Sequence, residues 1–165
     1  MKTIACSNCG TEARVVRGSY LFKDSGLRNV VLQGIEIVRC PKCGNEDPII
    51  PGVNDLMRTL ALAVTRKPYR LAGEEVRFLR KYLKMTGDEF SRLIHVDKTT
   101  LSKWENNEDP VGEQSDLLVR SVALALGEGL QEKHAEYVRF FSQIRVARRR
   151  VKIELNSQTM EFQYA

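Results

Sequence analysis

The sequence predicts an α+β chain of two modules, a small N-terminal β module held together by cysteines and an all-α module after it. Three observations predict this division. The four cysteines form two pairs near the N-terminus, and the stretch between the pairs is rich in Val, Ile, Leu and Tyr. Beyond about residue 54, apolar residues recur at helical spacing. A length of 165 residues suits one compact domain or two small ones.

The composition points to a cytoplasmic protein without a membrane partner. No apolar run of about 18 residues is present, so we predict no membrane span. The first residues lack an apolar stretch long enough for a signal peptide. Because the cytosol is reducing, we expect the cysteines to be metal ligands or free thiols rather than disulfides.

The first module, residues 1–50, carries the sequence Cys-x-x-Cys-Gly twice, at Cys6 and Cys9 and again at Cys40 and Cys43. The two-residue gap lets both sulfurs of a pair reach one ion, and the glycine can adopt the positive φ of a tight turn. Four thiolates fill a tetrahedral Zn²⁺ site, so we predict one structural zinc ion per chain. Two unconnected thiol pairs, or a redox pair, are the alternatives, but a redox pair usually accompanies a βαβ pattern, which the sequence lacks.

Between the cysteine pairs we predict two strands, at residues 12–22 and 29–38, joined by a turn at residues 24–26. The alternation of apolar residues changes phase at Gly34, which predicts a bulge or bend there. These elements complete a zinc ribbon, a module too small to have a sizeable core of its own.

Residues 51–70 form a predicted connector helix and linker. We expect the helix over about residues 55–65, capped by Asn54 and ended by Lys67 and Pro68. An apolar stripe at Leu56, Leu60 and residues 63–64 indicates buried packing, with a partner-binding face as the alternative.

Residues 71–128 form the predicted all-α module of four helices. The second helix opens with a capping box from Thr86 to Glu89, His95 lies in the turn after it, and Asp97 caps the third helix. The fourth helix covers residues 112–126. The predicted inward residues are Val76, Leu79 and Leu83; Phe90, Leu93 and Ile94; Leu101 and Trp104; and Leu117, Leu118, Val122 and Ala125.

The second and third helices have the pattern of a helix-turn-helix, and the third presents a short polar face without acidic residues. Side chains of this kind can reach base edges and phosphates in a major groove. A solvated helix face is the alternative. We therefore predict double-stranded DNA as a partner, with Lys98, Thr99, Thr100, Ser102, Lys103 and Asn106 as the candidate contact residues.

No arrangement of residues predicts an enzyme. The sequence shows no nucleophile–histidine pattern, no phosphate-binding glycine loop and no metal-ligand spacing around His95 or His134. Residues 69–130 hold 9 Lys and Arg against 11 Asp and Glu, so phosphate contacts must come from locally placed residues or from the flanks.

The tail, residues 129–165, is a candidate dimerisation element. We predict a helix over residues 130–149 with the apolar stripe Tyr137, Phe140, Phe141 and Ile144, ending in Arg145 and residues 148–150. The arginines are either a clamp on the DNA backbone or a solvated face. Residues 151–155 and 159–164 alternate weakly and predict a hairpin.

Two resemblances join these modules. The two cysteine pairs, with residues 34–35 ahead of the second, resemble the YgiT-type zinc finger. The second module carries Leu79-Arg80, Thr86, Glu89-Phe90, Leu93, Val96, Leu101 to Glu105 and Pro110, and through these residues it resembles the Xre/Cro-type, lambda-repressor-like helix-turn-helix. In this order over residues 1–126, the two motifs together resemble the MqsA antitoxin family of type II toxin–antitoxin systems.

The resemblance implies an antitoxin that also represses its own operon. The zinc module would bind and neutralise a protein toxin, often an mRNA-cleaving ribonuclease. The second module would form a homodimer on a palindromic operator, with recognition helices about 34 Å apart. Thr99 and Lys103 match the base-reading positions, where family members often carry Asn and Arg. Gly87 stands where many helix-turn-helix proteins have a backbone-holding Gln.

Two other functions fit the same residues. One is a stand-alone transcription factor of the Xre type whose zinc module is purely structural. The other is a repressor that responds to metal or to oxidation through its cysteines.

Overall fold

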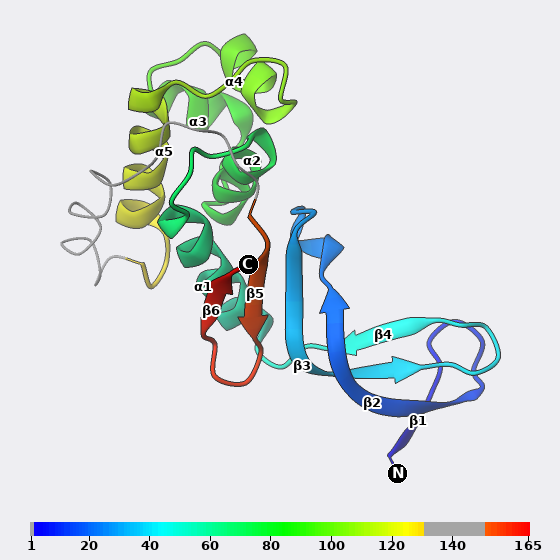
Figure 1. The fold of residues 1–165 in the computed structure, drawn as a ribbon. Coiled ribbons are helices and arrows are strands. Elements are labelled where there is room, and N and C mark those ends of the chain that lie inside the picture. Colours follow the sequence, from blue (N-terminus) through cyan, green and yellow to red (C-terminus); the bar gives the residue numbers. More distant parts are fainter. Residues whose placement is uncertain (1, 131–150) are drawn as a thin grey trace.

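The computed structural model describes residues 2–130 and 151–165, which form a six-stranded sheet and five α-helices (Figure 1). The predicted α+β class is confirmed. Within these residues, no helix has the length and apolar character needed to cross a bilayer. The strands are β1 (Thr3–Ala5), β2 (Glu12–Leu21), β3 (Val30–Arg39), β4 (Glu46–Ile49), β5 (Ile153–Asn156) and β6 (Phe162–Tyr164); the helices are α1 (Val53–Arg66), α2 (Gly73–Tyr82), α3 (Gly87–Leu93), α4 (Lys98–Glu105) and α5 (Glu113–Leu126).

A long antiparallel hairpin of β2 and β3 forms the centre of the sheet. Gly18 pairs with Ile35 but Tyr20 pairs with Leu32, so β3 carries one residue more than β2 between these pairs. Gly34, with φ of +67°, lies in this irregularity. The bulge predicted at Gly34 is therefore confirmed, and it divides β3 into two halves.

Each half of β3 has a different partner on its second edge. Residues 36–39 pair with β4, whereas residues 30–33 pair in parallel with β5. β6 pairs with β5 and ends the sheet. The predicted C-terminal hairpin is confirmed, but its place beside β3 was not predicted from the sequence. A pairing between residues 123 positions apart leaves no local pattern, although Ile153 and Leu155 are fully buried by it.

The main hydrophobic core runs from the sheet into the helices without a break. It contains Phe22, Leu32 and Ile37 from the long hairpin together with buried residues of all five helices and of β5. The apolar stripe of α1 is fully buried, as predicted, and the core is continuous across the linker at residues 66–71. A separate small cluster lies at the cysteine end; it consists of Cys6, Ala13, Val38 and Cys40, with Val15 and Ile49 packed against it.

The helix ends agree with the predictions in part. The Thr86–Glu89 capping box is present, because the Thr86 side chain accepts from the Glu89 N–H and the Glu89 carboxylate accepts from the Thr86 N–H. Asp97 is at the N-cap of α4 but its side chain makes no cap hydrogen bond. The predicted cap at Asn54 is wrong. Gly52, with φ of +64°, turns the chain early and starts α1 at residue 53.

The inward face of α5 differs from the prediction. Val119, Ala123 and Leu124 are buried, whereas Leu118 is 39% exposed and Ala125 is also exposed. The buried face also carries the charged residues Asp116 and Arg120. A prediction based on apolar residues alone therefore shifts the inward face by about one position along the helix. Leu93 of α3, also predicted inward, is 39% exposed.

The segment 131–150 lies outside the described residues. The predicted helix over residues 130–149, its apolar stripe, its arginines and His134 therefore stay predictions.

Two glycines that begin helices differ sharply in the space around them. A Cβ on Gly73, the first residue of α2, would lie 1.9 Å from the backbone oxygen of Trp104. A Cβ on Gly87, the first residue of α3, would meet nothing within 4 Å. The approach of α2 to the end of α4 therefore requires glycine at position 73.

We expect Gly73→Ala to lower the free energy of unfolding by about 1–3 kcal/mol, because the added methyl group forces α2 away from α4. Gly87→Ala is the matched control and should leave stability unchanged or slightly raised, since alanine is the better helix former. Urea denaturation of both variants measures the difference. Equal stability of the two would contradict the close approach at Gly73.

Candidate metal centre and nucleic-acid interface

The two cysteine pairs lie in turns of the same design. The Gly10 N–H donates to the Cys6 carbonyl at 2.9 Å, and the Gly44 N–H donates to the Cys40 carbonyl at 3.1 Å. Both glycines have positive φ, +70° and +71°. The first cysteine of each turn also donates its N–H to a residue five positions later. Each turn therefore aims two sulfurs toward the other turn, as the spacing predicted.

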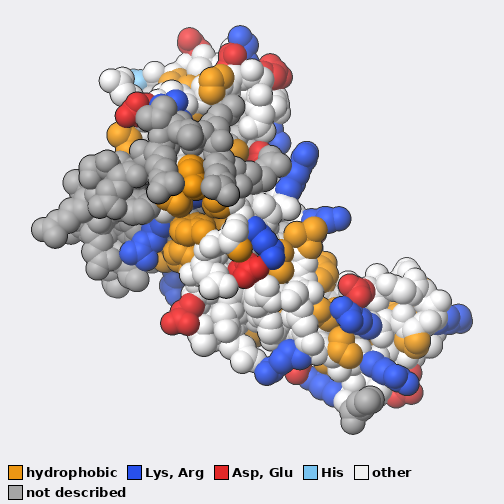
Figure 2. All heavy atoms as spheres, in the orientation of Figure 1, with side chains coloured by type: hydrophobic (Ala, Val, Ile, Leu, Met, Phe, Trp, Pro, Cys, Tyr) orange, Lys and Arg blue, Asp and Glu red, His pale blue; other side chains and the backbone are white. Residues whose placement is uncertain are grey.

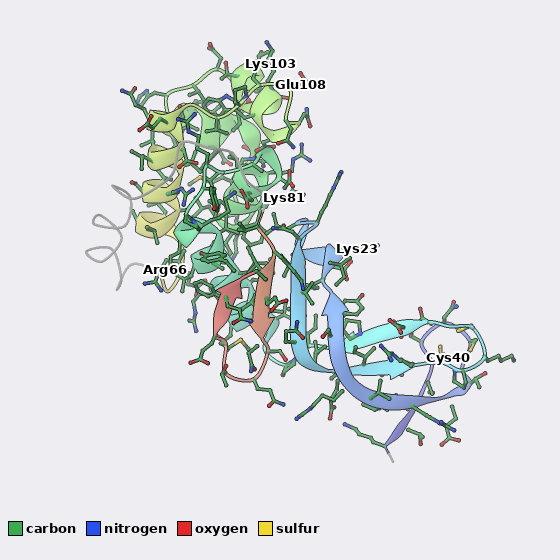
Figure 3. All side chains as sticks on the ribbon, viewed as in Figure 1. Lys23, Cys40, Arg66, Lys81, Lys103 and Glu108 are labelled. Atoms are coloured by element: carbon green, nitrogen blue, oxygen red, sulfur yellow. The ribbon has the colours of Figure 1, made fainter. Side chains whose placement is uncertain are left out.

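The four sulfurs meet at the open end of the β2–β3 hairpin, opposite its turn (Cys40 in Figure 3). Their Sγ atoms all lie within 4.8 Å of one another, with 3.6 Å between Cys6 and Cys43 and 3.5 Å between Cys9 and Cys40. A tetrahedron with zinc–sulfur bonds of 2.3 Å has sulfurs about 3.8 Å apart. The cluster is confirmed and could hold a metal ion of this kind. The identity of the metal stays a prediction.

Polar side chains tie the two turns together beside the sulfurs. The Ser7 hydroxyl donates to Asp47 Oδ2 at 2.5 Å, and Asn45 Nδ2 donates to the same oxygen at 2.8 Å. Asn45 Nδ2 also lies 3.2 Å from the Ser7 hydroxyl. Because residue 7 lies between the cysteines of the first pair and residues 45 and 47 follow the second pair, these bonds fix the distance between the turns.

The thiols are arranged for a cation. A hydrogen bond from the Thr11 side chain, with a second from its backbone, lowers the pKa of Cys9 to about 6. Backbone N–H groups of Cys9 and Asn8 lower the pKa of Cys6. The Asn45 N–H acts in the same direction on Cys43, but desolvation and the three other sulfurs raise its pKa to about 11. Four thiolates at this spacing repel one another, and a bound divalent cation removes the repulsion.

The second candidate site is the exposed face of α4, which is held from behind by packing and by ion pairs. Leu101 and Trp104 are buried against the core. Glu105, only 9% exposed, accepts from Arg80 twice, at 2.7 and 2.8 Å, and from Arg77 at 3.3 Å. Since both arginines belong to α2, these bonds fix α4 on α2.

Most of the predicted DNA-contact residues lie on the surface of this helix. Lys98, Thr99, Ser102, Lys103 and Asn106 are exposed, and Thr100 is half-buried. Figure 3 places Lys103 at the end of the molecule away from Cys40. The two candidate sites therefore lie at opposite ends of an elongated chain (Figure 1).

The surface around α4 is not uniformly basic. Lys98 pairs with Asp88 at 2.9 Å, and Lys103 pairs with Asp109 at 3.5 Å. The Asn106 side-chain oxygen accepts from Arg77 at 2.6 Å. Figure 2 shows acidic and basic side chains interspersed at this end of the molecule. The sequence prediction did not foresee these partners, because none lies on the α4 face itself.

Comparison of the chain with protein-family models, with curated proteins and with solved structures gave no match.

Proposed function

We propose that this protein is a DNA-binding transcriptional regulator, with α3 and α4 as a helix-turn-helix and α4 as the recognition helix. One observation carries the proposal. The buried side of α4 is anchored by Leu101, Trp104 and Glu105, while its opposite side presents hydroxyl, amide and ammonium groups to solvent. A helix held from one side with such a face can enter a major groove.

The side chains of this face can be divided into those that could contact base edges and those that could contact phosphates. Lys103 can donate to the O6 and N7 atoms of guanine, although without the planar fork that arginine offers. Thr99 and Ser102 can donate to or accept from base edges, and Lys98 lies at the start of the helix, where phosphate contacts set the register.

We further propose that the regulator is the antitoxin of a type II toxin–antitoxin system. The order of the two motifs along the chain supports this, and so does the separation of the two sites. A protein partner at the cysteine end would leave α4 accessible (Figure 1). In this proposal the four cysteines hold one structural Zn²⁺ ion, and the chain binds a palindromic operator as a homodimer.

The neighbouring gene provides the first test. We expect the product of an adjacent small reading frame to co-purify with this protein, and the pair to bind DNA upstream of the operon. A regulator that binds this DNA but has no such partner would instead be a stand-alone transcription factor. A metal- or redox-responsive repressor would be indicated if zinc removal or cysteine oxidation changed DNA affinity while the helices stayed folded.

We expect Lys103→Ala to weaken binding to the upstream DNA by about 1–3 kcal/mol, because one donor to a base edge is lost. Lys42→Ala, which removes an exposed lysine at the cysteine end, is the control of equal charge and should bind as the wild type does. Fluorescence anisotropy with a labelled duplex measures both. Identical affinities for the two variants would remove Lys103 from the contact surface.

A further inference from the structure

Two lysines of the proposed DNA-binding surface are each held by a carboxylate from a neighbouring segment. Asp88, on the first turn of α3, lies 2.9 Å from the Nζ atom of Lys98 and 3.9 Å from the guanidinium of Arg92. Asp109, in the loop after α4, lies 3.5 Å from the Nζ atom of Lys103. The two pairs flank the polar face of α4, one at each end of the helix.

We propose that Asp88 and Asp109 are specificity-determining residues. In non-specific complexes, where Lys103 has no guanine to contact, they compete with DNA phosphates for both lysines and so lower the affinity of the surface for arbitrary polyanions. The inference rests on the proposed function, since it concerns the same surface. It adds a repulsive element to a site that would otherwise be described by its attractive contacts alone. Discrimination between partners commonly needs such an element.

The pairs are strong enough to form and weak enough to open. The four side chains are between 48% and 70% exposed, and ion pairs in water contribute little stability. The pKa of Asp88 is lowered, first by its hydrogen bond with Lys98, so this carboxylate is charged at neutral pH. A lysine that moves to a phosphate leaves a carboxylate facing the DNA. The exposed carboxylate lowers the affinity for DNA. Non-specific binding is weakened most, because it consists of phosphate contacts only.

The effect has a signature in the dependence of affinity on salt. Each lysine that contacts a phosphate releases a cation from the DNA, which steepens the fall of affinity with salt. In the wild type, the carboxylate that has lost its lysine attracts a cation from solution, and this uptake offsets part of the release. Asparagine cannot do so. Asp88→Asn and Asp109→Asn should therefore bind more tightly and with a steeper salt dependence.

The experiment measures binding of a mixed-sequence DNA duplex over a series of salt concentrations. We expect each substitution to raise affinity roughly two- to five-fold at low salt, and the slope of log K against log salt to steepen by up to about 0.9. Asp55→Asn is the matched control, because it makes the same charge change and breaks a surface pair of 2.8 Å with Arg58 on α1, away from this surface.

The outcomes separate the inference from the proposed function. An equal increase for Asp55→Asn, or no increase for Asp88→Asn and Asp109→Asn, would overturn the inference while leaving DNA binding intact. A wild-type protein and variants that all fail to bind any duplex at low salt would overturn the proposed function as well. In a Lys98→Ala background, Asp88→Asn should have a smaller effect, and an undiminished one would show that Asp88 does not act through this lysine.

Discussion

Replacing Arg120 with methionine is expected to lower the free energy of unfolding by about 3–5 kcal/mol, because it leaves a buried carboxylate without its partner. Arg120 is fully buried on α5, and its Nε atom lies 2.8 Å from Asp116 Oδ2. The other oxygen of Asp116 accepts from the Leu71 N–H at 2.6 Å. The arginine therefore supports a carboxylate that itself holds the start of the α-helical module.

The same guanidinium also satisfies the end of α1. It donates to the carbonyl oxygens of Thr65, Lys67 and Tyr69 at 2.6 to 2.8 Å. Thr65 lies in the last turn of α1, where the carbonyls of a helix lack intrahelical partners, and Lys67 and Tyr69 lie in the linker to α2. A methionine would fill similar space but would remove the guanidinium donors from the buried carbonyls of Thr65 and Lys67, which adds to the cost.

Arg39→Met is the control that isolates burial. The Arg39 Nε atom lies 2.8 Å from Glu46, the same distance as in the Arg120 pair, but both side chains are about half exposed. We expect a loss of no more than about 1 kcal/mol. Urea denaturation followed by circular dichroism compares the two variants. Similar midpoints would mean that the Arg120 network does not hold the linker.

The Arg120 network also shows why part of the fold was not predicted from the sequence. An acidic residue four positions before a basic one usually marks an exposed helix face, and Asp116 and Arg120 have this spacing. Their burial depends on carbonyl partners about 50 residues away. Local patterns contain no information about such partners, which is why the inward face of α5 was assigned one position away.

Features set by adjacent residues were predicted well. The cysteine turns, the bulge at Gly34 and the Thr86 capping box each depend on a few neighbouring residues, and all three are present. The pairing of β5 with β3 depends instead on two strands at opposite ends of the chain. The carboxylates beside Lys98 and Lys103 come from α3 and from the loop after α4, so their effect on the candidate site required the structure.

Replacing Cys40 with serine is expected to abolish stoichiometric metal binding and to unfold only the cysteine end of the protein. Structural zinc contributes about 10–16 kcal/mol of binding free energy to small zinc modules, and three thiolates with a hydroxyl cannot retain most of it. Beyond the sulfurs, this end is stabilised by a small cluster around Ala13 and Val38. We therefore expect the protein to contain one zinc ion per chain before the substitution and none after it.

Hydrogen exchange can locate the boundary of this unfolding. Residues 30–33 of β3 pair with β5 and belong to the main core, so their amides should stay protected in Cys40→Ser. Residues 36–39 pair with β4 and should lose protection. Under the proposed function the variant should still bind DNA, because α2 to α5 pack in the main core. Ser7→Ala, which removes a hydrogen bond beside the cluster but no thiolate, should retain its zinc.

Zinc retained in Cys40→Ser would refute the ligand assignment. Loss of protection throughout α2 to α5 would show that the metal end and the helices unfold as one unit.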